Sequence, residues 1–104
     1  MPDVSAPLLG DQWPVLAGQL QSALRQEGEG QLAMQVQSLP VVARCDCGDS
    51  FCQSFYTETP PDGRYPDRLR NVWCQEPGWP GYLILDVVEE RIHFVEVLYR
   101  GPLD

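Results

Sequence analysis

The end of the chain carries the strongest structural signal in the sequence. Two runs, Tyr82–Val88 and Arg91–Tyr99, are dense in β-branched and aromatic residues, and only Glu89 and Glu90 separate them. Runs of this kind around a two-residue turn predict an antiparallel β-hairpin. The turn length predicts that Leu85 faces Phe94. The face expected under a helical layer is then Leu83, Leu85, Val87, Ile92, Phe94 and Leu98.

The same pairing predicts that Asp86 faces His93 across the hairpin. Such a pair is either a surface ion pair, an imidazole oriented as a general base, or a metal ligand. Glu96 interrupts the predicted apolar face, and a buried carboxylate there needs a cation. Arg70 or Arg100 is the expected partner.

Helical periodicity dominates the beginning of the chain. A stripe recurring at helical spacing predicts a helix from about Gln12 to Glu27, capped by Asp11 and stopped by Gly28. The stripe consists of Trp13, Leu16, Ala17, Leu20 and Leu24. Residues 31–39 fit either a strand or a short helix, and we favour the helix, which Pro40 ends.

Between these regions the sequence alternates strands with loops. Residues 41–57 predict a hairpin that turns at Gly48-Asp49, and residues 70–74 predict one further short strand. We therefore expect an α+β fold, with one or two N-terminal helices on an antiparallel meander sheet of four to five strands. Its 104 residues fit a single domain, with residues 1–10 as a loosely ordered leader.

Charge and termini exclude several classes of protein. A net charge of −8 repels nucleic acid. The first ten residues lack the basic and apolar runs of a signal peptide or membrane span. We expect a cytoplasmic protein that does not bind membranes and is a monomer or homodimer.

Three cysteines lie close together in the predicted hairpin. If the turn centres on Gly48-Asp49, Cys45 lies opposite Cys52, and all three thiols share one sheet face. Zinc needs convergent thiolates, and a later strand offers a fourth ligand. The candidate ligands are Cys45, Cys47, Cys52 and Cys74. The alternatives are buried core thiols and a redox or disulfide role.

This hairpin also carries a resemblance. The pattern C-x-C-G-x3-C-x2-F-Y-T spans Cys45 to Thr57, and the closing hairpin follows with Ile84–Val88 and Val95–Leu98. Over roughly residues 30–100 the chain resembles a group of small bacterial proteins from GC-rich genomes. The resemblance implies a bacterial cytoplasmic protein and no particular activity.

Residues 59–81 combine proline and glycine with aromatic and arginine side chains. Irregular spans this long in a small domain often bind a partner, and this composition is typical of binding hot spots. The alternative is that Trp73 and Trp79 close the core. The candidate partner-binding residues are Arg64, Tyr65, Arg68 and Trp79.

Three functional classes remain for such a chain. A non-enzymatic protein-interaction or regulatory module, acidic and suited to a basic partner, is the interpretation that we favour. The alternative is a zinc-binding domain built on the cysteine hairpin. An enzyme is disfavoured because the sequence offers no recognisable arrangement of nucleophile and base, and no cofactor other than zinc is indicated.

Overall fold

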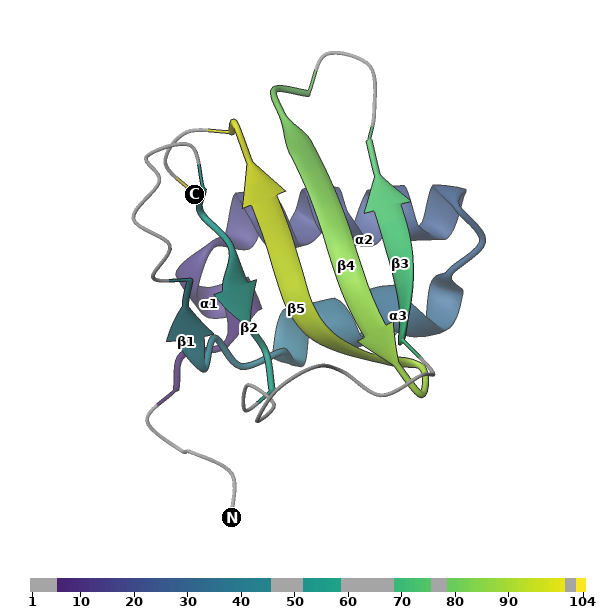
Figure 1. Ribbon diagram of the computed structural model, residues 1–104, viewed down its shortest axis with the longest axis horizontal. Coiled ribbons are helices and arrows are strands. Elements are labelled where there is room, and N and C mark those ends of the chain that lie inside the picture. Colours follow the sequence, from purple (N-terminus) through teal and green to yellow (C-terminus); the bar gives the residue numbers. More distant parts are fainter. Residues whose placement is uncertain (1–5, 46–51, 59–68, 76–78, 101–102) are drawn as a thin grey trace.

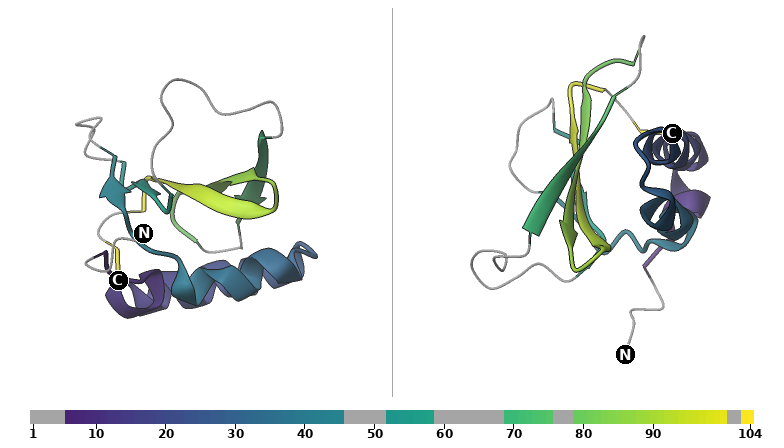
Figure 2. Two further views of the ribbon diagram at one scale, coloured as in Figure 1. Left: turned by 90° about the horizontal axis from the view of Figure 1, so that it is seen from below. Right: turned by 90° about the vertical axis from the view of Figure 1, so that its right-hand side faces the viewer.

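The computed structural model describes residues 6–45, 52–58, 69–75, 79–100 and 103–104. Its helices are α1 (Leu9–Gln12), α2 (Pro14–Gln26), α3 (Gly30–Gln35) and the 3-10 turn η1 (Val36–Ser38). Its strands are β1 (Ala43–Arg44), β2 (Phe55–Tyr56), β3 (Leu69–Cys74), β4 (Tyr82–Val88) and β5 (Arg91–Leu98). The strands form one antiparallel sheet in the order β1-β2-β5-β4-β3, and the helices lie on one of its faces (Figures 1 and 2). The predicted α+β class is confirmed, with β3–β4–β5 as the meander and β1–β2 added beside β5.

The predicted first helix forms, and its apolar stripe is buried as expected. Leu16, Ala17, Leu20 and Leu24 are each at most 1% exposed. The N-cap differs from the prediction, because Asp11 lies within α1 and Trp13 occupies the cap of α2 without a side-chain hydrogen bond. Residues 31–39 adopt the helical alternative, as α3 and η1.

The segment before the first long helix is more ordered than its composition suggests. Leu9 is fully buried, and its backbone N–H donates to the carbonyl oxygen of Leu39 at 2.7 Å. Leu8 forms a bridge with Pro40. The expectation of a loose leader is therefore wrong for residues 8–10, because backbone pairing and one buried leucine fix them to the chain after η1.

The β4–β5 hairpin has the predicted bounds, except that β5 ends at Leu98 and not at Tyr99, but a different register. Glu89 and Glu90 both have positive φ, 51° and 62°, as a tight primed turn requires. Val87 pairs with Ile92 as predicted, yet Asp86 pairs with Phe94, so His93 is an extra residue in β5. This β-bulge shifts every later pair by one position.

The bulge exchanges the two faces of β5. Val95 and Val97 are fully buried in the core, whereas Phe94 and Leu98 are only half-buried. The predicted face is right for Leu83, Leu85, Val87 and Ile92 and wrong for Phe94 and Leu98. A one-residue shift has this effect because strand side chains alternate between faces.

The first hairpin is short and also differs in register. Ala43 pairs with Tyr56, and the Cys45 N–H donates to the Ser54 carbonyl oxygen at 2.9 Å. Cys45 is therefore not opposite Cys52, and the predicted pairing is wrong by two residues. Cys52 bridges to Leu98 of β5 instead. The predicted turn at Gly48-Asp49 lies outside the described residues.

Two buried hydroxyls complete the junction between β2 and β5. Ser54 accepts a hydrogen bond at 2.9 Å from the N–H of Val97, and Thr57 donates one at 2.6 Å to the carbonyl oxygen of Ile92. These side chains satisfy backbone groups where the short ladder ends. None of the helices in the described ranges is long and apolar enough to cross a membrane.

Substitution by alanine should have opposite effects on stability at two of the glycines. Gly81 has φ +68°, and a Cβ there would collide with the carbonyl oxygen of Leu98. Gly18 lies exposed within α2, with no atom near the position of its Cβ. Gly81→Ala should destabilise the protein by about 2 kcal/mol or more, whereas Gly18→Ala should stabilise it by about 1 kcal/mol. Urea denaturation measures both, and equal effects would contradict the described geometry at Gly81.

Candidate partner-binding face

The sheet presents one face away from the helices, which we call the outer face. Leu83, Leu85 and Val87 of β4 point into the core, so the residues that alternate with them point outwards. Directly paired residues share a face, which extends the assignment to the neighbouring strands. The outer face consists of Tyr56, Leu69, Asn71, Trp73, Tyr82, Ile84, Asp86, Val88, Arg91, Phe94, Glu96 and Leu98.

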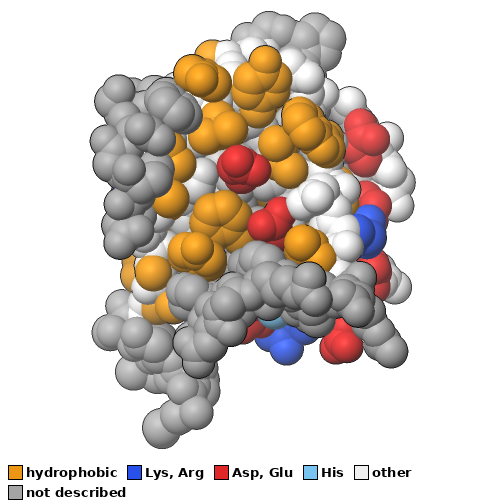
Figure 3. Space-filling view, viewed as in Figure 1, with side chains coloured by type: hydrophobic (Ala, Val, Ile, Leu, Met, Phe, Trp, Pro, Cys, Tyr) orange, Lys and Arg blue, Asp and Glu red, His pale blue; other side chains and the backbone are white. Residues whose placement is uncertain are grey.

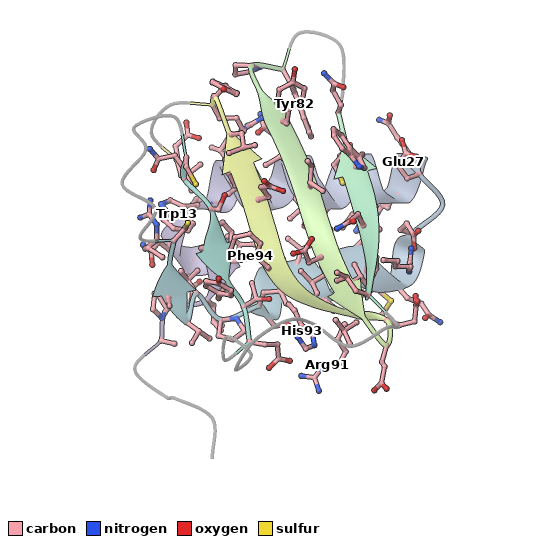
Figure 4. All side chains as sticks on the ribbon, viewed as in Figure 1. Trp13, Glu27, Tyr82, Arg91, His93 and Phe94 are labelled. Atoms are coloured by element: carbon pink, nitrogen blue, oxygen red, sulfur yellow. The ribbon has the colours of Figure 1, made fainter. Side chains whose placement is uncertain are left out.

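Large aromatic side chains are exposed at one end of this face. Trp73 is 59% exposed, Tyr82 42%, and Tyr99, directly after β5, 58%. Their rings meet edge to face, with centroids 6.4 Å apart for Trp73–Tyr82 and 6.3 Å for Tyr82–Tyr99. Hydrophobic side chains gather over β3, β4 and β5 in Figure 3, and Figure 4 shows Tyr82 near the upper end of the sheet.

A shallow hollow adjoins these rings. It has a volume of about 280 Å³ and is lined by Gln75, Trp79, Gly81, Tyr82 and Tyr99. The absence of a side chain at Gly81 lets β4 approach the chain at Leu98 and Tyr99 closely. The exposed aromatic end is therefore uneven and offers a recess beside its rings.

Two carboxylates lie within the otherwise apolar outer face. Asp86 and Glu96 are both half-buried, and acidic side chains are visible among hydrophobic ones in Figure 3. Asn71 Nδ2 donates to Asp86 Oδ1 at 2.6 Å. Burial raises the pKa of Asp86, and the hydrogen bond from Asn71 opposes this only in part. Ionised Asp86 thus lies where a charge is poorly solvated.

The predicted Asp86–His93 pair does not form. Asp86 lies opposite Phe94 because His93 is the extra residue of the bulge. Figure 4 shows His93 at the lower end of the sheet near Arg91. Glu96 likewise lies opposite Ile84 on the outer face, so the prediction that it interrupts the core face is wrong. Its predicted partner Arg70 instead pairs with glutamates elsewhere.

The two candidate arginine partners of Glu96 have other roles. Arg70 bonds Glu29 at 2.8 and 3.0 Å and Glu90 at 2.8 Å, which joins the start of α3 to the β4–β5 turn. This pairing lowers the pKa of Glu29. Arg100 bonds Gln19 and lies 5.2 Å from the centre of the Trp79 ring.

Of the predicted partner-binding residues, only Trp79 is described. It packs partly against the core and lines the hollow beside Tyr82. Arg64, Tyr65 and Arg68 lie outside the described residues. Sequence reasoning missed Tyr99, and it placed Trp73 in the core as an alternative to binding. Pairing with Ile84 places Trp73 on the outer face, and β3 is an edge strand, neither of which composition reveals.

The described cysteines fall on both sides of the sheet. Cys52 pairs with outward-facing Leu98, and Cys45 is bonded to Ser54, the neighbour of core residue Phe55. Cys74 is buried on the helix side, at the opposite edge of the sheet, so the structure does not bring it to the other two.

The environment of Cys74 also disfavours a thiolate. Burial, with the negative charges of Glu27 and Glu29, raises the pKa of its thiol to about 12. The described residues contain no group of three or more histidine, cysteine or acidic side chains that could hold a metal. Cys47 lies outside those residues, so zinc at Cys45, Cys47 and Cys52 stays a prediction.

A scan against protein-family models and searches of curated proteins and of solved structures found no match to this chain. The function is therefore inferred from the geometry of the outer face.

The raised pKa of Asp86 predicts a pH-dependent effect of Asp86→Asn. The folded chain binds the proton more tightly than the unfolded chain, so the associated stability is present below the unfolded pKa of about 3.9. That stability is lost as the pH rises through the folded value. Asp86→Asn keeps an acceptor for Asn71 and should exceed the wild type in stability at neutral pH but not in acid. Urea denaturation of both proteins at neutral pH and in acid measures the difference in stability. A variant less stable than the wild type at neutral pH would contradict the prediction.

The zinc hypothesis predicts different behaviour for two cysteines. If Cys45 is a ligand, Cys45→Ser should release zinc and lower stability steeply, because metal binding contributes directly to folding. Cys74→Ser, on the other side of the sheet, should leave the metal content unchanged. Native mass spectrometry of the reduced protein with elemental analysis measures both, and a metal-free wild-type protein would end the hypothesis.

Proposed function

We propose that this protein is a non-enzymatic interaction module whose outer face binds a partner protein. The observation that carries the proposal is the exposure of three adjoining aromatic side chains, Trp73, Tyr82 and Tyr99, at one end of the outer face. Aromatic residues are enriched in protein interfaces because they bury a large area at low cost in conformational entropy.

The composition of the outer face supports this function. Half-buried Phe94 and Ile84, of which only 8% is exposed, form the apolar centre of the face. Asn71 and the tyrosine hydroxyls provide hydrogen-bonding groups around it. A contiguous apolar surface with polar groups at its margin is typical of a binding site in a soluble protein. The paired strands β3, β4 and β5 position these groups, so a partner would order few of them on binding.

Catalysis has less support from the described residues. Asp86 does not orient His93, because the bulge separates them in register. Cys74, with its raised pKa, is protonated at neutral pH and is a weak nucleophile. These features favour a binding role over the chemistry that the sequence left open.

A paired capture experiment tests the proposed function. The immobilised protein is exposed to an extract of the cells that encode it, in parallel with a Trp73→Ser/Tyr99→Ser variant. Truncating interface aromatics costs about 2 kcal/mol or more, which corresponds to about a 30-fold weaker Kd. The wild-type protein should retain a stoichiometric partner that the variant loses.

The control removes equally exposed apolar side chains from the helices. Val15 is 51% and Met34 80% exposed on α2 and α3, so Val15→Ser/Met34→Ser should retain the partner. Circular dichroism confirms that each variant folds. A partner retained by the outer-face variant, or lost from both variants, would contradict the proposal.

A further inference from the structure

The carboxylates of the outer face form a regular pattern with its apolar side chains. Asp86 of β4 lies opposite Phe94 of β5, and two residues along, Ile84 lies opposite Glu96. Asp86 and Glu96 are therefore diagonal neighbours, a relation that brings side chains within reach of one another. Ile84 and Phe94 occupy the other diagonal, and Figure 4 shows Phe94 in the middle of the sheet.

No described arginine is paired with either of these carboxylates. Four described arginines contact other residues: Arg44 contacts Gln53 and Trp13, Arg70 contacts Glu29 and Glu90, Arg91 contacts Glu58, and Arg100 contacts Gln19 and Trp79. Asp86 has the amide of Asn71 as its hydrogen-bond donor. The charge of the face is thus negative where the face is most apolar.

Docking an uncharged partner on this surface would be unfavourable. A second apolar surface would remove the remaining water from Asp86 and Glu96 and leave two buried carboxylates without a counter-ion. The partner must therefore carry a cation between its apolar contacts. Arginine suits the pattern better than lysine, since its planar fork pairs with carboxylates while its face stacks on an aromatic ring.

We propose that the outer face recognises an arginine side chain of its partner protein, held between Asp86 and Glu96 and stacked against Phe94. The inference rests on the proposed function and specifies the chemistry of the partner. The apolar residues that flank this arginine in the partner contact the exposed ring of Trp73 and the small exposed part of Ile84.

Two short synthetic peptides test the proposal on the full chain. Acetyl-Leu-Ser-Arg-Ser-Leu-amide, when extended, places arginine between two leucines on one face. The second peptide replaces arginine with citrulline, which has nearly the same shape without the charge. Titrations of isotope-labelled protein at low salt, followed by NMR, report both affinity and location. The arginine peptide should bind about tenfold more tightly and shift the amide signals of β4 and β5.

Matched variants assign this preference to the two carboxylates. Asp86→Asn/Glu96→Gln should abolish the preference for arginine. Asp11→Asn/Glu27→Gln makes the same change in net charge at exposed positions, within α1 and at the end of α2, and should retain it. Retention by the first variant, or loss in the second, would overturn the proposal.

The remaining outcomes separate this inference from the proposed function. Equal binding of both peptides at the outer face would overturn the arginine proposal and leave the docking face intact. Binding of neither peptide would also overturn the arginine proposal. The capture experiment would then test independently whether a partner docks on the outer face. A wild-type dimer in sedimentation, dispersed by Trp73→Ser/Tyr99→Ser, would make a second copy the occupant and also overturn it.

Discussion

The extra residue at His93 determines which side chains the sheet offers to the helices. Because of it, Val95 and Val97 are fully buried on the helix side of the sheet, and Glu96 lies outside. In an unbroken ladder Glu96 would face the core, where an unpaired carboxylate costs several kcal/mol. The bulge thus keeps the carboxylate of Glu96 out of the core and places Val95 and Val97 there. The same shift brings Phe94 and Leu98 to the outer face and creates the surface to which we assign binding.

The sequence predicts those parts of the fold that depend on local pattern. The helical stripe from Trp13 to Leu24, the β3 strand and the bounds of the last hairpin all follow from periodicity and residue type. The bulge was missed because a two-residue turn fixes the register only next to the turn. The spacing of Ile92, Val95 and Val97, with Glu96 between the valines, is the signal that could have revealed it. Leu9 was missed because neighbouring proline and glycine obscure its pairing with Leu39.

Less of the binding face could be predicted than of the fold. Aromatic composition drew attention to residues 59–81, but it could not show that Trp73, on an edge strand, lies beside Tyr82 and near Tyr99. That proximity comes from strand order and register, which depend on contacts distant in sequence. The predicted Asp86–His93 pair shows the opposite case, in which a single extra residue in β5 separates two side chains that the sequence pattern placed together. The function that we propose depends on side chains that lie on different strands and are brought together by strand pairing.

Binding at the outer face requires that this face is open to solvent and to a partner. Hydroxyl-radical footprinting with mass spectrometry measures this directly at individual tryptophans. Trp73, at 59% exposed, should be oxidised several-fold faster than Trp13, at 8%, and its rate should fall when the captured partner is bound. If Trp73 in the unbound protein is as protected as Trp13, the outer face is already covered and the central claim is wrong.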